Sequence, residues 1–265
     1  MINKFKIILI IAFFGLNYSY ADSGVDPNFL SKMRTLSESR GSIWKIYKSY
    51  ILLGLKNNYK NPKKVFDDSI KAYEQAIKES EDYTKKNNYT KTLQILQESE
   101  KEWKELKELF LQTPSQNNIP KIDQLSMKVT RTIIKALKAM GAHDQSKRWN
   151  YLAKTQKAQN IAQRMATLYL DNVYGGLPKD RYDKMMKKAT GNYIKVKNLV
   201  LGSKFSNDAI EKVIKSADRD YQYFKFMWNT HSNYYIPTLI YEKSSDMDKK
   251  MGECTTFIYN QLITE

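Results

Sequence analysis

Apolar residues recur at alternating spacings of three and four along most of the chain, which is the period of an amphipathic α-helix. One segment shows the pattern at Leu93, Leu96, Trp103, Leu106 and Phe110. Later segments repeat it at Ile122, Leu125, Val129, Ile133, Leu137 and Met140, and again at Ile236, Ile240, Met247, Met251, Cys254, Ile258 and Leu262. No stretch sustains the alternation of period two that a half-buried strand requires. The sequence therefore predicts an all-α fold.

Breaks in this pattern divide the chain into helices. Only 10 glycines and 6 prolines occur in 265 residues, and most of them fall between the periodic segments. The breaks lie at residues 61–62, 86–88, 113–120, 141, 175–178, 202–208 and 231–237. They predict about eight helices, each roughly 20–30 residues long, and the short loops between them favour up-down helical bundles.

The chain also suggests an internal repeat. Four predicted helices precede Gly141 and four follow it, and residues 48–52 align with residues 167–171 at an offset of 119. We therefore expect two tandem four-helix modules, the first over residues 22–141 and the second over residues 142–265. Two modules placed end to end and one continuous bundle both agree with this pattern.

Residues 1–21 have the features of a secretory signal peptide. Two lysines precede an apolar run over residues 7–16, and Ser19 and Ala21 are the small residues of a signal peptidase site. The run is shorter than the roughly 20 residues of a transmembrane helix, and no later stretch is apolar enough to span a bilayer. We expect export to the periplasm with cleavage after Ala21; the alternative is an uncleaved membrane anchor.

The charge of the chain favours anionic partners. Lysine and arginine number 44 against 28 acidic residues, a formal net charge of +16. Such an excess suits polyanions, anionic membrane surfaces or small anions, although a lysine-rich genome would produce it without any functional reason. The export signal argues against nucleic acid as the partner.

Residues of catalytic and metal sites are sparse. His143 and His231 are the only histidines and Cys254 is the only cysteine, so no disulfide forms within the chain and no paired metal-ligand spacing exists. We expect the histidines at the surface or at helix ends, and Cys254 as a buried thiol on an apolar stripe. The sequence predicts a binding protein without metal or cofactor, and not an enzyme.

Polar residues interrupt two helix faces that are otherwise apolar. Ser37 and Arg40 fall in the stripe that runs from Leu30 to Ile51 through Met33, Trp44 and Tyr47, and Gln156, Gln159 and Gln163 fall in the stripe from Trp149 to Val173. A buried polar group needs hydrogen-bond partners, and a buried arginine needs a counter-charge, which a bound anion would supply. Two alternatives remain open. Arg40 could reach solvent at the edge of its stripe, or the fifth helix could bury Ala158, Ile161, Met165 and Leu168 and expose its glutamines.

Residues 163–170, with the sequence QRMATLYL, resemble the centre of a known sensor domain. It is the periplasmic input domain shared by type IV pilus methyl-accepting chemotaxis transducers and nitrate/nitrite sensor kinases. This resemblance implies four-helix bundles, a homodimer in some relatives, and an arginine on the first helix of each bundle that binds a nitrate- or nitrite-like anion.

Mapped onto this chain, the resemblance places Arg40 at the anion-binding position of the first copy and Gln159 at that of the second. Lys45 and Arg164 occupy the second basic position of each copy. We therefore expect a sensor-like module that binds its ligand through Ser37, Arg40, Trp44, Lys45, Gln156, Gln159, Gln163 and Arg164, and that acts through a membrane-bound receptor or kinase. The alternative is a structural or adaptor protein whose basic helical faces bind cell-envelope polymers or another protein.

Overall fold

The computed structural model describes residues 26–144, 148–229 and 236–264. Across these residues the chain forms eight α-helices, one short 3₁₀ helix and no strand, so the predicted all-α fold is confirmed. The α-helices are α2 (Pro27–Gly54), α3 (Pro62–Lys86), α4 (Thr90–Phe110), α5 (Ile119–Gly141), α6 (Trp149–Tyr174), α7 (Lys179–Leu201), α8 (Asp208–Asn229) and α9 (Pro237–Thr264). The signal peptide expected over residues 1–21 lies outside the described residues, and so does His231.

Local sequence sets several of the helix ends. Asp26 accepts a hydrogen bond from the amide of Asn28, and Pro27 occupies the first position of α2, where a missing N–H is tolerated. Asn61 caps α3 in the same way, ahead of Pro62. Gly175 ends α6 in the left-handed conformation, with φ at 81°, which glycine adopts without steric strain.

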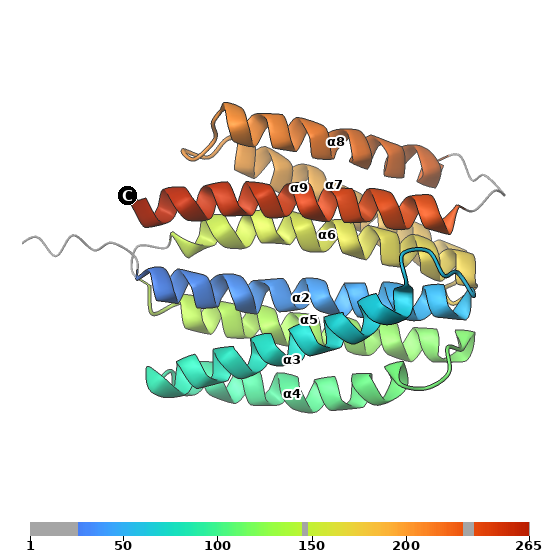
Figure 1. Ribbon diagram of the computed structural model, residues 1–265, viewed down its shortest axis with the longest axis horizontal. Coiled ribbons are helices and arrows are strands. Elements are labelled where there is room, and N and C mark those ends of the chain that lie inside the picture. The colour runs from blue at the N-terminus through green and yellow to red at the C-terminus, as the bar shows by residue number, and fades with distance from the viewer. Residues whose placement is uncertain (1–25, 145–147, 230–235, 265) are drawn as a thin grey trace, which may run out of the picture.

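Helices α2 to α5 pack against one another, and so do helices α6 to α9. The two groups lie side by side, joined by packing of α2 against α6 (Figure 1). Buried apolar residues from all eight helices form one continuous hydrophobic core. Within the described residues, no helix has the length and apolar character needed to cross a membrane.

Helices α2 and α6 run parallel at the centre of the molecule. The carbonyl of Ser37 accepts a hydrogen bond from Asn160, and seven residues later the carbonyl of Trp44 accepts one from Thr167. Both pairs are separated by 123 residues, and this constant separation holds only when two helices share a direction. We call this contact between α2 and α6 the central seam.

Candidate functional site

Small and polar side chains let α2 and α6 approach closely along the central seam. Gln156 donates a hydrogen bond of 3.0 Å to the carbonyl of Arg34. A Cβ added at Gly41 would lie 2.9 Å from Oδ1 of Asn160, so only glycine leaves room for that amide in its present position. The seam is thus partly polar, although it lies within the core.

Of the two arrangements that the sequence left open, most of the polar stripe residues adopt the buried one. Arg40 is 9% exposed, whereas Ser37, Trp44, Gln156 and Gln163 are almost fully enclosed. Arg40 is therefore largely enclosed, with a small part of its side chain still exposed. The alternative face of α6 is also largely buried, because α2, α7 and α9 surround this helix. Only Gln159 among the three glutamines is half-buried.

Arg40 lies on the side of the seam that faces α5 and α7. It shares a helix face with Tyr47, whose hydroxyl donates to the carbonyl of Ile119 in α5. No described residue accepts a hydrogen bond from Arg40 or forms an ion pair with it, and its Nε is enclosed without a partner. Burial lowers the pKa of its guanidinium to about 10.

The charges around Arg40 are positive. Burial lowers the pKa of Lys157, and the nearby positive charges of Arg40 and Lys195 lower it further. The buried hydroxyl of Ser37, one turn before Arg40, also lacks a hydrogen-bond partner. This group of residues, which we call the Arg40 cluster (Ser37, Arg40, Lys157 and Lys195), carries donors and positive charge but no carboxylate.

Arg164 lies further along the same side, with its charge already compensated. It forms an ion pair with the buried carboxylate of Asp123, which also pairs with Arg181 at 3.0 Å. The guanidinium of Arg164 stacks over the ring of Trp44, with its Cζ 4.3 Å from the ring centroid. Two of the expected ligand-binding residues thus contact each other, and Asp123 is a partner that the sequence reasoning missed.

Asp171 is a second buried carboxylate close to this network. Its oxygens accept no hydrogen bond of ordinary geometry, although the hydroxyl of Tyr47 lies close enough to act on its pKa, and the residue is fully enclosed. Burial raises the pKa of its carboxyl well above the usual range, and the positive charge of Arg164 opposes part of that rise.

Lys45 lies on the opposite side of the seam, towards α3 and α9. Its ammonium pairs with Asp248 of α9 at 2.8 Å. Nearby, the fully buried Lys48 donates hydrogen bonds of 2.8 Å to Gln163 and 2.9 Å to Ser244. Burial lowers the pKa of Lys48 to about 7. Sequence reasoning also missed Lys48, which interrupts the apolar series of the first helix much as Arg40 does.

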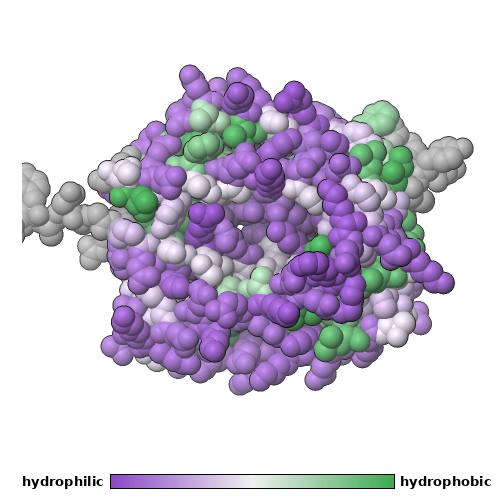
Figure 2. Space-filling model, viewed as in Figure 1, coloured by the Kyte–Doolittle hydropathy of each residue, from purple (hydrophilic) through white to green (hydrophobic). Residues whose placement is uncertain are grey.

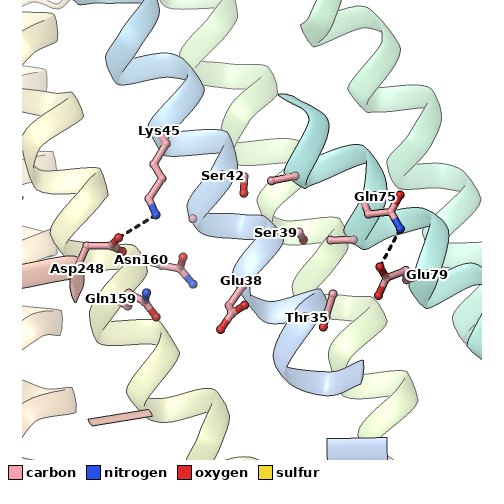
Figure 3. A pocket seen from close by; sticks show the side chains of 13 residues that line it. Thr35, Glu38, Ser39, Ser42, Lys45, Gln75, Glu79, Gln159, Asn160 and Asp248 are labelled. Carbon is pink, nitrogen blue, oxygen red and sulfur yellow. Dashed lines mark hydrogen bonds and ion pairs between the residues drawn. The ribbon is translucent and has the colours of Figure 1, made fainter. Parts of the chain in front are cut away.

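A pocket of about 400 Å³ opens between α2, α3, α6 and α9 on this side (Figure 3). Figure 2 shows a hollow near the centre of the corresponding face, surrounded by hydrophilic residues. The lining side chains that carry polar groups are Thr35, Glu38, Ser39, Ser42, Lys45, Gln75, Glu79, Gln159, Asn160 and Asp248. Gln159 and Lys45 therefore belong to this pocket, which we call the α3/α9 pocket, and not to the Arg40 cluster.

The offset of 119 residues found in the sequence aligns residues of α2 with residues of α6 that lie on the opposite side of the seam. That offset relates Lys45 to Arg164, and the structure pairs Lys45 with a carboxylate of α9 and Arg164 with a carboxylate of α5. It also relates Arg40 to Gln159, which lie on opposite sides of the seam. The expected site residues thus lie at two places, on opposite sides of the seam.

The remaining expectations concern His143 and Cys254. His143 is exposed near the end of α5 and stacks on Tyr89, with ring centroids 3.8 Å apart. Cys254 is fully buried, and burial raises the pKa of its thiol to about 12. Such a thiol stays protonated at neutral pH, which is the state of an unreactive packing residue.

Comparison of the chain with protein family models, with curated proteins and with solved structures finds no match. The function is therefore inferred from the geometry of the central seam.

Proposed function

We propose that this chain is a sensor-like binding module of the periplasm, which holds a small anion against Arg40 and reports its occupancy to a membrane-bound receptor or kinase. The observation that carries the proposal is the buried guanidinium of Arg40, to which no described residue offers a counter-charge or a hydrogen bond. The resemblance of residues 163–170 to periplasmic sensor domains supports the same assignment.

The other cations of the seam have partners within the chain. Lys45 pairs with Asp248, and Arg164 pairs with Asp123. A buried charge without a partner is strongly unfavourable, because the lost hydration is not replaced. Lys45 and Arg164 thus each receive a carboxylate from the chain, whereas Arg40 receives none from the described residues. This difference supports a counter-charge for Arg40 that comes from outside the chain.

The chemistry of the Arg40 cluster favours a compact oxyanion. A guanidinium presents several N–H donors in a planar fork, which matches two oxygens of a planar anion such as nitrate or nitrite. The hydroxyl of Ser37 is a further donor without a partner, and Lys157 adds positive charge. A long polyanion would fit poorly, because Arg40 is enclosed by the helices around it.

A titration of thermal stability tests the proposal. The purified protein, in a buffer of low anion content, is heated at increasing concentrations of sodium nitrate or sodium nitrite, with sodium fluoride as a salt control. Binding to the folded state alone adds RT ln(1 + [L]/Kd) to its stability, so we expect the melting temperature to rise with nitrate or nitrite. Arg40→Met should abolish this rise.

Arg131→Met is the matched control, because Arg131 is an exposed arginine of α5 on the outer surface. It should leave the response to nitrate intact. If no oxyanion raises the melting temperature, or if both variants lose the response equally, the proposal fails. A protein that only binds envelope polymers through its lysines would show salt-sensitive polymer binding that Arg40→Met does not change.

A further inference from the structure

We infer that the outer face formed by α5 and α7 docks on the anionic headgroups of a phospholipid membrane. Residues 124–141 of α5 contain lysine and arginine but no acidic residue, and the same is true of residues 184–201 of α7. Other helices mix the two signs on their exposed faces, as in the ion pair of Lys63 with Asp67 on α3. The two stretches thus carry positive charge that no acidic residue of the same stretch offsets.

Helices α5 and α7 lie on the same side of the central seam and run in the same direction. The carboxylate of Asp123 on α5 pairs with Arg181 on α7, so the two helices are neighbours there. The hydroxyl of Tyr47, late in α2, donates to the carbonyl of Ile119 at the start of α5, so α5 is antiparallel to α2. Helix α7 follows α6 after a short loop, packs against it and is antiparallel to it. Since α2 and α6 are parallel, α5 and α7 are also parallel to each other.

Exposed cations of the two helices lie level with one another beyond this ion pair. Arg131 lies eight residues after the α5 partner of the pair, and Lys188 lies seven residues after the α7 partner. Lys138 and Lys195 repeat this arrangement fifteen and fourteen residues after the same two partners. Seven or eight residues make about two helical turns, or roughly 11 Å, so each cation returns to about the same face of its helix. The two helices therefore present cations in two level pairs.

None of these four cations forms an ion pair with a described residue, and neither do Lys135 and Lys184 beside them. We call this set the basic face (Arg131, Lys135, Lys138, Lys184, Lys188 and Lys195). Burial lowers the pKa of Lys157 on α6, and the nearby positive charge of Lys195 lowers it further, so like charges lie close together here. Such an arrangement is unfavourable by itself, and an anionic surface would neutralise it.

A planar array of anions fits the basic face better than a single linear polyanion. The cations lie in two parallel rows on neighbouring helices, so their charge is spread in two dimensions, as the headgroups of a bilayer are. Leu199 adds an apolar side chain to the same face, because it follows Arg181 by 18 residues, or five helical turns. Its side chain is 44% exposed. Exposed leucine beside lysine suits the boundary between headgroups and acyl chains, and it has no role in binding a soluble polyanion.

Cosedimentation with lipid vesicles tests this inference. The purified protein is mixed with vesicles of phosphatidylcholine alone or of phosphatidylcholine with phosphatidylglycerol, at low and at high sodium chloride. We expect binding to the anionic vesicles that falls with added salt, and little binding to the neutral ones. The double variant Arg131→Gln/Lys188→Gln removes one level pair. It should weaken binding about thirtyfold, because each cation near an anionic surface contributes about a fivefold factor.

Lys104→Gln/Lys215→Gln is the matched protein control. It removes the same charge from exposed lysines of α4 and α8, which lie outside the basic face. This variant should bind the anionic vesicles like the unchanged protein. Both double variants should keep the response to nitrate, and Arg40→Met should keep the binding to vesicles. Failure of the docking inference and failure of the anion proposal are thereby distinguishable.

Three results would overturn the inference: no binding to the anionic vesicles, equal binding to both kinds of vesicle, or equal losses in the two double variants. Equal binding to both vesicles would indicate insertion of an apolar segment such as residues 7–16. Sodium polyphosphate provides a further arm. If it binds through Arg131 and Lys188 while the vesicles do not, the basic face serves a linear polyanion, and this result also overturns the inference.

Discussion

Lys48 of α2 donates a 2.8 Å hydrogen bond to the side-chain oxygen of Gln163 across the central seam. The same ammonium lies 4.2 Å from the centroid of the Tyr241 ring, and no carboxylate contacts it directly. These neutral contacts replace only part of the hydration that burial removes, which is why the pKa of Lys48 falls to about 7.

This pKa predicts how stability changes with pH. In the unfolded chain Lys48 keeps its proton up to its ordinary value of 10.5, whereas in the folded protein it loses the proton near pH 7. Between these values the unfolded state binds more protons, so the free energy of unfolding rises with pH, by up to about 1.4 kcal/mol per unit. Below pH 7 both states are protonated and this contribution is constant.

Urea unfolding at pH 7, 8 and 9 measures the effect. Lys48→Met fills a similar volume without the charge, and its stability should rise less over this range than that of the unchanged protein. Lys104→Met, at an exposed lysine of α4, is the control and should keep the original slope. Equal slopes in all three proteins would contradict the prediction.

Arg40→Met should stabilise the protein in the absence of anions. Replacing a largely buried charge that has no partner among the described residues by an apolar side chain of similar length removes an unfavourable burial, so we expect a gain of about 1–3 kcal/mol, the cost of burying a polar group without a hydrogen bond. Urea unfolding in a buffer of low ionic strength gives the change directly. A loss of stability would mean that Arg40 has a stabilising role in the ligand-free fold.

Asp123→Asn should have the opposite effect. It leaves Arg164 and Arg181 without their shared carboxylate, and Arg164 is almost completely buried. Breaking a buried ion pair from one end costs about 3–5 kcal/mol. Glu105→Gln, which breaks the exposed pair with Lys121, is the control and should cost less than about 1 kcal/mol. Similar losses in both variants would argue against a central role for Asp123.

Two glycines should respond to alanine with opposite signs. A Cβ at Gly141 would overlap the indole ring of Trp149, so Gly141→Ala should destabilise the protein by about 1–3 kcal/mol. A Cβ at Gly191, inside α7, would meet nothing within 4 Å. Gly191→Ala should therefore add about 1 kcal/mol through its higher helix propensity. Thermal melts of the two variants give both signs in one experiment.

The helical period was sufficient to predict the class of fold and the positions of most breaks. The helical period was less informative for α2 and α6. An apolar stripe predicts one buried face of a helix, whereas these two helices are buried on most sides. For the same reason both candidate faces of α6 turned out to be largely enclosed. Polar residues within an apolar series nevertheless marked Arg40 and Gln163 as candidates for buried groups, and the structure encloses most of both side chains.

Pairing across the seam could not be predicted from the sequence. Arg164 and Asp123 are 41 residues apart, and Lys45 and Asp248 are much further apart. Which carboxylate reaches which cation depends on how the helices pack and on the reach of each side chain. The same limit applies to the α3/α9 pocket, whose walls come from four helices that only the folded chain brings together.

The parallel arrangement of α2 and α6 has an evolutionary consequence. In a symmetric pair of identical chains, every substitution beside such a seam would appear twice. The two sides of the seam would then always carry the same residues and favour the same ligand. A single chain that carries both halves is free of this constraint. Within one chain, a difference such as arginine at position 40 and glutamine at position 159 is confined to one side of the seam and leaves the other side unchanged.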